Sequence, residues 1–463
     1  MRRILASTLV AVATLAAALA AADGRGVEQS DGSRPNFVVV MTDDQRVDEL
    51  GAMRTVRERL AGAGVTFTNA YATFPLCCPS RATFLTGQYA HNHGVMDNEW
   101  AGGGGYRAFD NTGSLPVALQ GAGYRTGLVG KYMNEYEGPE IPEGWSHWAV
   151  RTRGQTLFDY RLNVNGKRVE YGSSPREYQT DVVARRGARF IRQSSGASPF
   201  FLWTSFFAPH GESIPGDERW NPRPAPRHRG RYELAQLATT PAFNERNVSD
   251  KPSFVAGSRR LSRAAVRDLT WRHRSREAAL LSVDDAVERF LRTLRRTGEL
   301  DETVVVFVSD NGFLVGEHRF QHKEQLYEEA TRVPLIMSGP GLPEGANYDG
   351  IVGNIDLAPT ILDAAGVRPM REPDGRSLLG LLSDPEPERD ILLETAVSTA
   401  VRTPDWMYAE HRTRNGVEPE LYDMRADPFQ LRSLAGDAGV ADQQAALADR
   451  LDELRDCVGP ACG

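Results

Sequence analysis

Residues 36–45 read Asn-Phe-Val-Val-Val-Met-Thr-Asp-Asp-Gln. Residues 36–41 form a compact apolar run of the length that is typical of a buried strand. Polar and acidic residues follow the run immediately. The stretch therefore predicts a buried strand whose carboxyl end opens onto a polar site.

Three later apolar runs also end in polar or charged groups. Residues 126–129 precede Lys131, residues 200–207 precede His210, and residues 304–308 precede Asp310 and Asn311. Helical patterns separate the runs, most clearly the apolar positions at 3.6-residue spacing between 279 and 294. Alternating strands and helices predict an α/β fold with a mostly parallel sheet covered on both faces. Ligands of such sheets bind beyond the carboxyl ends of the strands.

The composition is that of an ordinary globular protein. The 463 residues are 41% hydrophobic and 25% charged, and 54 Lys and Arg against 61 Asp and Glu give a net charge of −7. These values exclude a disordered chain, a collagen and a cysteine-rich mini-scaffold. A mildly acidic chain gives no reason to expect nucleic-acid binding.

The first 22 residues have the pattern of a secretory signal peptide. Met1-Arg2-Arg3 precedes an uncharged run at 4–22, and Ala18-Leu19-Ala20 fits a signal peptidase site. The alternative is an uncut anchor helix, for which the run is barely long enough. We therefore expect a secreted protein without stable membrane insertion after processing. Export permits disulfides, and we expect one between Cys457 and Cys462.

The remaining chain predicts two structural regions. Residues 34–370 carry the α/β pattern, and residues 371–463 have short segments with turn signals, which predict an antiparallel subdomain closed by a helix at 441–455. Within the first region, residues 211–274 are rich in Pro and Arg and predict a long insertion over the active face. It is interpreted either as a basic lip for an anionic substrate or, preferably, as a solvated loop.

Residues 77–87 read Cys-Cys-Pro-Ser-Arg-Ala-Thr-Phe-Leu-Thr-Gly. They resemble the signature of the Cys-type sulfatases, C-x-P-S-R followed by a short spacer and T-G. In that family a maturation enzyme oxidises the first cysteine to formylglycine, an aldehyde whose hydrate is the nucleophile. The resemblance places this residue at Cys77 and implies an alkaline-phosphatase-like fold for the catalytic domain at 34–370. The alternative is that Cys77 and Cys78 are small core residues.

Hard oxygen ligands stand at two of the predicted strand ends. Asp43, Asp44, Asp310 and Asn311 are the donors expected for Ca²⁺, or for Mg²⁺, rather than for zinc. A thiol suits such an ion poorly, and oxidation of Cys77 would replace its sulfur with oxygen. We therefore expect residue 77 to complete the metal site.

The resemblance also assigns the cationic groups of the site. Pro79 suits the first turn of a helix, which would put residue 77 at an anion-attracting helix N-terminus. Arg81 would stabilise the hydrate and the sulfate, and Lys131 matches the sulfate-contacting lysine of the family. His210 matches a histidine near the leaving group, and Lys323 matches a second substrate lysine.

Several motifs resemble the N-acetylglucosamine-6-sulfatase branch, which acts on heparan-type sugars. Residues 131–136 read Lys-Tyr-Met-Asn-Glu-Tyr, with Met133 where many arylsulfatases carry histidine. Residues 89–93 and 280–285 point the same way. His91 and His93 either line the pocket or are satisfied loop histidines. The implied substrate is a sulfated carbohydrate or an aryl sulfate.

The predicted reaction is sulfate-ester hydrolysis. Asp310 would help to deprotonate the hydrate, and His210 or Lys323 would protonate the departing alcohol. One alternative is a phosphonate or phosphate ester hydrolase of the same superfamily. The other is a non-catalytic binder of sulfated glycans, which applies if Cys77 stays unmodified.

Overall fold

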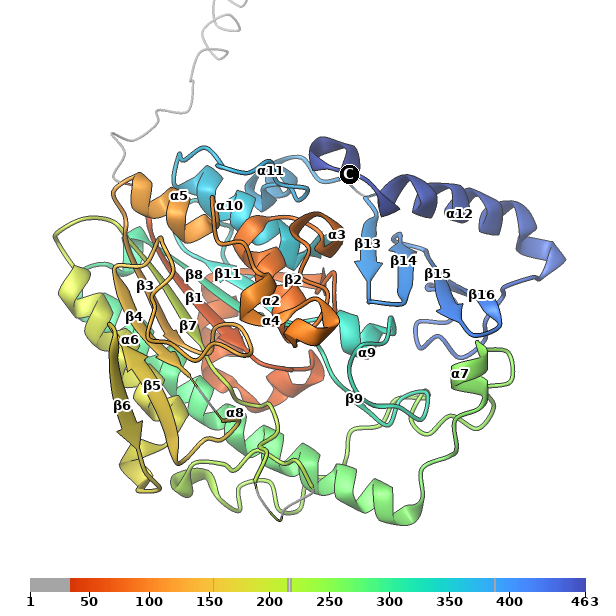
Figure 1. Cartoon of the computed structure of the whole chain (residues 1–463), viewed down its shortest axis with the longest axis horizontal. Helices are drawn as coiled ribbons and strands as arrows, with labels where there is room; N and C mark the ends of the chain where they lie inside the picture. The colour runs from red at the N-terminus through yellow and green to blue at the C-terminus, as the bar shows by residue number, and fades with distance from the viewer. Residues whose placement is uncertain (1–33, 153, 215, 217–218, 387–388) are drawn as a thin grey trace, which may run out of the picture. The chain divides into compact units, whose positions relative to one another are not determined.

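The computed structural model describes residues 34–463, except 153, 215, 217, 218, 387 and 388 (Figure 1). The predicted signal peptide at 1–22 lies outside the described residues. Residues Pro35–Gly463 form one compact unit. In this described part, no helix combines the length and the apolar character needed to cross a bilayer.

Ten strands form the larger sheet. They are β1 (Asn36–Thr42), β2 (Gly64–Tyr71), β3 (Arg125–Gly130), β4 (His147–Arg151), β5 (Tyr160–Val164), β6 (Lys167–Tyr171), β7 (Phe200–Ser205), β8 (Thr303–Ser309), β11 (Leu335–Ser338) and β12 (Ala346–Gly353). Their spatial order is β12-β2-β11-β8-β1-β7-β3-β4-β5-β6. The central strands β8, β1, β7, β3 and β4 are mutually parallel, whereas β11, β5 and β6 pair antiparallel. The predicted mostly parallel sheet is confirmed.

The alternation of side chains along β1 divides the core into two layers. Phe37, Val39 and Met41 belong to one buried cluster, and Val38 and Val40 belong to the other. Successive strand residues face opposite sides of a sheet, so both faces of β1 must be covered. Four helices cover the first face, namely α2 (Cys77–Thr86), α5 (Leu115–Gly121), α10 (Leu357–Ala364) and α11 (Leu378–Ser383), and α6 (Gln179–Ser194) and α8 (Arg263–Thr297) cover the second (Figure 1).

Shorter elements connect these layers. They are α3 (Ala90–His93), α4 (Gly105–Ala108), α7 (Ser253–Ala256), α9 (Glu328–Thr331), β9 (Leu314–Val315) and β10 (Gln321–His322). Gly87, the last residue of the sulfatase-like signature, ends α2 with φ of 71°. This left-handed conformation favours glycine, which explains the residue type at that position.

Helix α8 begins inside the segment predicted to be a loop insertion. The Ser262 side chain accepts a hydrogen bond from the Ala265 N–H and caps the helix, and Leu269 is buried. Residues 263–274 are therefore helical, because a cap and an inward-facing apolar residue outweigh the local richness in arginine. The predicted insertion is thus shorter at its C-terminal end.

Acidic side chains pair with arginines of the remaining insertion. Arg223 contacts Glu212 at 2.8 Å, and Arg227 bridges Asp181 at 2.6 Å and Asp285 at 2.8 Å. These charges are matched within the protein, so the contacts favour the solvated-loop interpretation over the basic lip.

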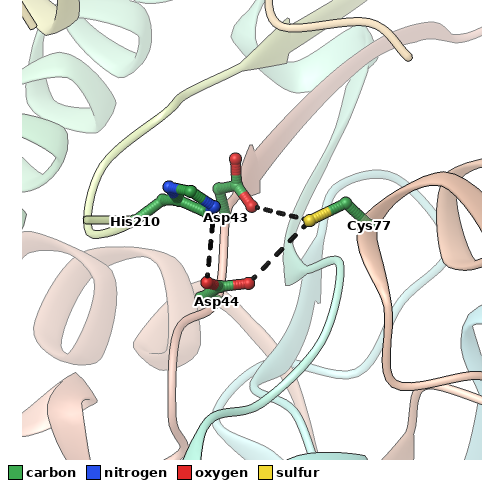
Figure 2. A group of neighbouring side chains, drawn as sticks. All are labelled: Asp43, Asp44, Cys77 and His210. Carbon is green, nitrogen blue, oxygen red and sulfur yellow. Dashed lines mark hydrogen bonds and ion pairs between the residues drawn. The ribbon is translucent and has the colours of Figure 1, made fainter. Parts of the chain in front are cut away.

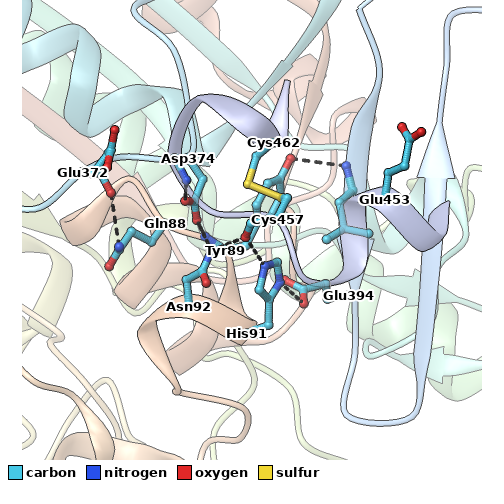
Figure 3. Close-up of a disulfide and its surroundings, with 12 residues drawn as sticks. Gln88, Tyr89, His91, Asn92, Glu372, Asp374, Glu394, Glu453, Cys457 and Cys462 are labelled. Carbon is cyan, nitrogen blue, oxygen red and sulfur yellow. Dashed lines mark hydrogen bonds and ion pairs between the residues drawn. A yellow bond between two sulfur atoms is a disulfide. The ribbon is translucent and has the colours of Figure 1, made fainter. Parts of the chain in front are cut away.

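The C-terminal region contains a second sheet, as expected. β13 (Ile391–Glu394), β14 (Ser398–Arg402), β15 (Trp406–Thr413) and β16 (Gly416–Asp423) pair antiparallel in sequence order. Helix α12 (Ala441–Arg455) contributes Leu447, Leu451 and Leu454 to the same buried cluster as these strands. The predicted disulfide between Cys457 and Cys462 follows the helix (Figure 3).

Leu280→Ala should lower the free energy of unfolding by about 2–5 kcal/mol, because Leu280 is fully buried between α8 and the sheet. Leu234→Ala is the matched control, since Leu234 is 88% exposed and its truncation should change stability by less than about 0.5 kcal/mol. Denaturant unfolding of both variants measures the difference. Equal losses would contradict the assigned packing of α8.

Candidate active site

Polar side chains from four strand ends lie together at one edge of the larger sheet. Asp43 and Asp44 follow β1, and Lys131 follows β3. His210 lies beyond β7, and Asp310 and Asn311 follow β8. All six side chains are buried, and Figure 2 shows Asp43, Asp44 and His210 facing Cys77. The structure therefore brings these polar side chains together at the carboxyl edge of the sheet, where the sequence predicted them.

Cys77 is the first residue of α2, where the backbone N–H groups and the helix dipole favour an anion. Its Sγ lies 3.4 Å from Asp43 Oδ1, 4.0 Å from Asp44 Oδ1 and 2.8 Å from Lys323 Nζ. Burial raises the pKa of the Cys77 thiol to about 12. The unmodified thiol is therefore neutral at physiological pH and a weak nucleophile.

Cys78 has a different environment. Its sulfur accepts a hydrogen bond from the Asn134 N–H at 3.1 Å, and the Cys78 N–H donates to Asn98 Oδ1 at 2.9 Å. The residue belongs to the buried cluster on the α2 side of the sheet. The core-residue interpretation thus describes Cys78, whereas Cys77 faces the polar site.

Two carboxylates and two ammonium groups form a buried charge cluster (Asp43, Asp44, Lys131 and Lys323). Lys131 Nζ lies 2.6 Å from Asp43 Oδ2, and Lys323 Nζ lies 2.6 Å from Asp44 Oδ1. Burial alone would raise the pKa of Asp43, but Lys131 and the other cations hold it well below its ordinary value. Burial would lower the pKa of Lys323, but Asp44 keeps it well above its ordinary value. Asp43, Asp44 and Lys323 are therefore charged at neutral pH.

Arg81 makes its hydrogen bonds to the protein itself. Its Nε and Nη2 donate to Asp310 Oδ2 at 2.9 and 2.8 Å, and its Nη1 donates to Ser205 Oγ at 2.7 Å. Nη1 also reaches the carbonyl oxygens of Lys131 and Tyr132. Arg81 therefore ties α2 to the ends of β3, β7 and β8, and direct sulfate binding by Arg81 stays a prediction.

The Asp310 carboxylate is occupied as well. Its Oδ2 accepts from Arg81, and its Oδ1 accepts from the backbone N–H groups of Asp44 and Asn311 at 3.0 and 2.9 Å. Burial raises the pKa of Asp310 to about 6. Both oxygen atoms of the Asp310 carboxylate therefore already accept hydrogen bonds from the protein.

His210 presents one free nitrogen to the site. Its Nδ1 lies 2.7 Å from the Gly211 carbonyl oxygen and must donate to it, so Nε2 carries the lone pair in the neutral ring. Nε2 lies 3.8 Å from Asp44 Oδ2. Burial lowers the pKa of His210 to about 4, so the imidazole is neutral. Phe207 and Trp220 flank the ring at 4.6 and 4.7 Å between centroids.

The site has donors suited to a divalent cation. Ligand atoms of Asp43, Asp44, Cys77 and His210 lie within 4.8 Å of one another. Asp44 Oδ2 and Asn311 Oδ1 are buried and lack a hydrogen-bond partner in the described part of the chain. Buried oxygen atoms without donors are what a hard cation would satisfy. The group of four neighbouring ligand residues includes His210, which was not among the metal ligands expected from the sequence, and does not include Asp310.

His91 and His93 lie outside the charge cluster and bond to other groups. His93 contacts Thr83 Oγ1 through Nε2 at 3.0 Å and accepts from the Val95 N–H through Nδ1 at 3.1 Å. His91 lies 2.9 Å from both Glu394 Oε1 and the Cys457 carbonyl oxygen (Figure 3). These contacts agree with the interpretation of both as satisfied histidines, although both lie in the short helix α3 and not in a loop.

Three residues near the site were missed by sequence reasoning. Ser205 and Arg151 are the last residues of β7 and β4, so the rule that ligands bind beyond strand ends would have found them. Trp220, from within the insertion, packs edge-to-face against His210. Its position depends on a loop without periodic pattern, so the sequence holds no signal for it.

Comparison with known proteins identifies the class. Residues 35–367 match the sulfatase family, and residues 316–457 match the family described as N-sulphoglucosamine sulphohydrolase, C-terminal. The chain belongs to the sulfatase family.

Individual relatives carry related names. An extracellular sulfatase SULF-1 homolog of Drosophila melanogaster is 36% identical over 75% of this chain, which spans 31% of that relative's length. The human N-acetylglucosamine-6-sulfatase is 32% identical, with 93% of this chain and 86% of that protein covered. Both names agree with the predicted family, and the second also agrees with the predicted N-acetylglucosamine-6-sulfatase branch.

A solved structure of a protein in complex with its substrate, D-glucosamine-2-N,6-O-disulfate, has a TM-score of 0.76 and 26% identity to this chain. The match covers 91% of this chain and 97% of the other. The predicted alkaline-phosphatase-like α/β class is confirmed.

His91→Gln and His93→Gln should alter stability with opposite pH dependence. Burial lowers the pKa of His91, but the hydrogen bond to Glu394 outweighs it, so the pKa is raised. The stabilisation by His91 is complete below about pH 6.5 and is lost as the pH rises through the folded-state pKa. His91→Gln should therefore cost most, about 1–3 kcal/mol, in acid.

Burial lowers the pKa of His93 to about 3. Below about pH 6.5 the unfolded chain binds a proton at His93 and the folded protein does not, which lowers the free energy of unfolding of the wild type. His93→Gln removes this effect, so the substitution should cost the least stability in acid. Urea unfolding at a series of pH values measures both variants. Parallel pH profiles would contradict these assignments.

Proposed function

We propose that the protein is a secreted sulfatase that hydrolyses a sulfate ester to an alcohol and inorganic sulfate. The preferred substrate is a carbohydrate O-sulfate such as glucosamine 6-sulfate, and an aryl sulfate is the second candidate. One observation carries the proposal, namely that Cys77 begins a helix and faces Asp43, Asp44 and Lys323 in a buried site of paired charges, which a bound divalent cation would make positive. Such a site favours a small tetrahedral anion.

The proposal includes conversion of Cys77 to formylglycine by a maturation enzyme. Burial raises the pKa of the Cys77 thiol to about 12, which argues against the thiol as nucleophile. A hydrated aldehyde at residue 77 would supply two hydroxyl groups, one to attack sulfur and one to release the bound sulfate by losing its proton. The atoms balance because attack on sulfur breaks its bond to the alcohol oxygen, which leaves with a proton from the enzyme. The sulfate then departs with the oxygen that attacked, and water rehydrates the aldehyde.

The contacts of residue 77 suggest which group accepts its proton. Asp43 Oδ1 is 3.4 Å from the Cys77 sulfur, whereas the oxygen atoms of Asp310 accept from Arg81 and from two backbone N–H groups. A general base must lie within hydrogen-bonding distance of the proton that it accepts before its basicity matters. We therefore infer that Asp43 accepts the proton and that Asp310 orients Arg81. The earlier expectation of Asp310 as the base remains the alternative.

The departing alcohol needs a proton donor, and two side chains were expected to serve. Lys323 is charged, since Asp44 keeps its pKa well above the ordinary value despite burial. His210 is neutral and directs its unprotonated Nε2 into the site. We therefore infer that Lys323 donates the proton, while His210 contacts the substrate or the metal. Lys131 would contact the sulfate oxygens and neutralise charge that develops there.

A divalent cation, Ca²⁺ or Mg²⁺, fits the oxygen atoms that lack donors. We infer that Asp43, Asp44, Asn311 and residue 77 hold it, with Asp310 or His210 as a further ligand. When bound, the cation would supply positive charge to the sulfate oxygens. Its charge would add to those of Lys131 and Lys323, which already pair with the two carboxylates of the charge cluster.

The substrate and the location rest on names of relatives and on the N-terminal pattern. Relatives are named N-acetylglucosamine-6-sulfatase and extracellular sulfatase, and a structural neighbour holds a sulfated glucosamine. We extend these properties to this chain together with the predicted signal peptide at 1–22.

A phosphonate or phosphate ester hydrolase is the nearest rival, because both anions are tetrahedral and suit the same cations. Rates on matched aryl sulfate and aryl phosphate esters distinguish the two, and faster turnover of the phosphate would favour the rival. A non-catalytic glycan binder would turn over neither ester.

Addition of Ca²⁺ to the metal-depleted protein should raise its melting temperature, with a stabilisation of about 2.7 kcal/mol at a hundredfold excess over Kd. Asn311→Ala removes one oxygen donor and should reduce this gain. Asn347→Ala, at an exposed position of β12, is the matched control and should respond like the wild type. Thermal unfolding with Ca²⁺, with Mg²⁺ and with chelator measures the effect. An unchanged melting temperature in all three would contradict the metal site.

Mass spectrometry of the peptide with residue 77, from natively produced active protein, should show the lower mass of an aldehyde in place of the thiol. Cys77→Ser should accept one sulfate and then stall, because serine lacks the second hydroxyl. Cys78→Ser is the matched control and should keep multiple turnover, since its sulfur contacts Asn98 and Asn134. An intact thiol in active enzyme, or sustained turnover by Cys77→Ser, would refute the mechanism.

A further inference from the structure

Arg151 is an arginine beside the site with unused hydrogen-bonding capacity. It ends β4, whose parallel pairing with β3 brings it to the same edge of the sheet as Lys131. Its Nη1 is shielded from solvent and has no hydrogen-bond partner among the described residues. Burial lowers the pKa of Arg151 to about 10, which leaves it charged at neutral pH. A shielded, charged donor without an acceptor is costly, so the position favours an anionic ligand.

Neighbouring carboxylates do not neutralise Arg151. Glu212 accepts from Arg223 and from the Leu157 N–H, and Asp43 pairs with Lys131. Within the described ranges no ion pair involves Arg151, whose guanidinium instead stacks on Phe207, with Cζ 4.2 Å from the ring centre. This stacking fixes the direction of the guanidinium but satisfies none of its N–H groups.

The same phenylalanine links Arg151 to the proposed active site. Lys131 Nζ lies 5.9 Å from the centre of the Phe207 ring, and the His210 ring lies 4.6 Å from it. Two cations and one proposed substrate-binding histidine thus surround a single aromatic ring. An anion held by Arg151 would therefore lie beside the same ring as a sulfate held by Lys131.

A cavity of about 200 Å³ contains both cations. Lys131 is buried, whereas Glu99, Glu135 and Glu137 on the same cavity wall are exposed, so the basic groups occupy its inner part. The other polar lining groups include Asn134 and Gln155. Amide and carboxylate groups pair readily with sugar hydroxyls, which suits the cavity to a carbohydrate.

We propose that Arg151 binds a second anionic group of the substrate, a sulfate or a carboxylate other than the scissile sulfate. Arg151 is then a specificity residue that makes the enzyme prefer multiply charged sugars. This inference rests on the proposed function and narrows its substrate class.

The test compares Arg151→Gln with the wild type on four substrates. D-glucosamine-6-O-sulfate has no second anion, D-glucosamine-2-N,6-O-disulfate adds an N-sulfate, and a uronate-containing disaccharide of glucosamine 6-O-sulfate adds a carboxylate. An aryl sulfate reports on the chemistry alone. Arg151→Gln should lower kcat/KM about tenfold to hundredfold on whichever multiply charged substrate uses Arg151, and much less on D-glucosamine-6-O-sulfate and the aryl sulfate. The substrate on which kcat/KM falls identifies the anion that Arg151 binds as a sulfate or a carboxylate.

Two further variants keep the test independent of folding. Arg151→Lys keeps the charge and should retain part of the preference. Arg125→Gln is the matched control, because Arg125 also stacks on a phenylalanine, with Cζ 5.2 Å from the Phe190 ring centre, but lies at the opposite end of β3. It should leave the preference unchanged.

An equal loss on all four substrates, or none on any, would overturn the role of Arg151 while leaving the sulfatase proposal standing. A wild-type protein with aldehyde at residue 77 and no turnover of any sulfate ester would overturn both. Melting temperatures of the variants separate lost recognition from lost structure.

Discussion

The buried ion pair between Arg81 and Asp310 holds the functional end of the sheet together. Arg81 comes from α2 and reaches Asp310 after β8, Ser205 at the end of β7 and the Lys131 carbonyl after β3. Both side chains are completely shielded from solvent. Loss of one partner of such a pair costs about 3–5 kcal/mol, because a buried charge is left alone. The pair thereby fixes the start of α2, and with it Cys77, against the acidic end of β1.

The local field of the site differs from that of the whole chain. The net charge of −7 describes solubility and says little about anion binding. At the sheet edge, Lys131 and Lys323 balance Asp43 and Asp44, and Arg81 balances Asp310. A bound divalent cation would make this region positive, and Arg151 adds a further unmatched charge beside it. An acidic protein can therefore present a cationic pocket to a sulfated sugar.

Much of the fold followed from local patterns. The strands at β1, β3, β7 and β8 were predictable because each is apolar over its length and ends in polar groups. The C-terminal helix was predictable to the residue. The start of α8 was not predictable, because the surrounding sequence is polar and rich in arginine. The helix begins there because Ser262 caps it and one leucine of its first turns is buried. The signature and the strand ends identified the residues of the site, but they did not predict the hydrogen bonds and ion pairs between those residues.

The sequence by itself determined which residue types stand at the ends of the strands, because apolar periodicity and a short signature are local properties. Only the tertiary structure decided how those side chains are used. It separated Cys77 from Cys78, directed Arg81 to Asp310, took His91 and His93 out of the site and left Arg151 without an acceptor. Each outcome depends on partners from distant segments. Hydrogen bonds and burial are set by neighbours in space, and the order of residues along the chain does not specify them.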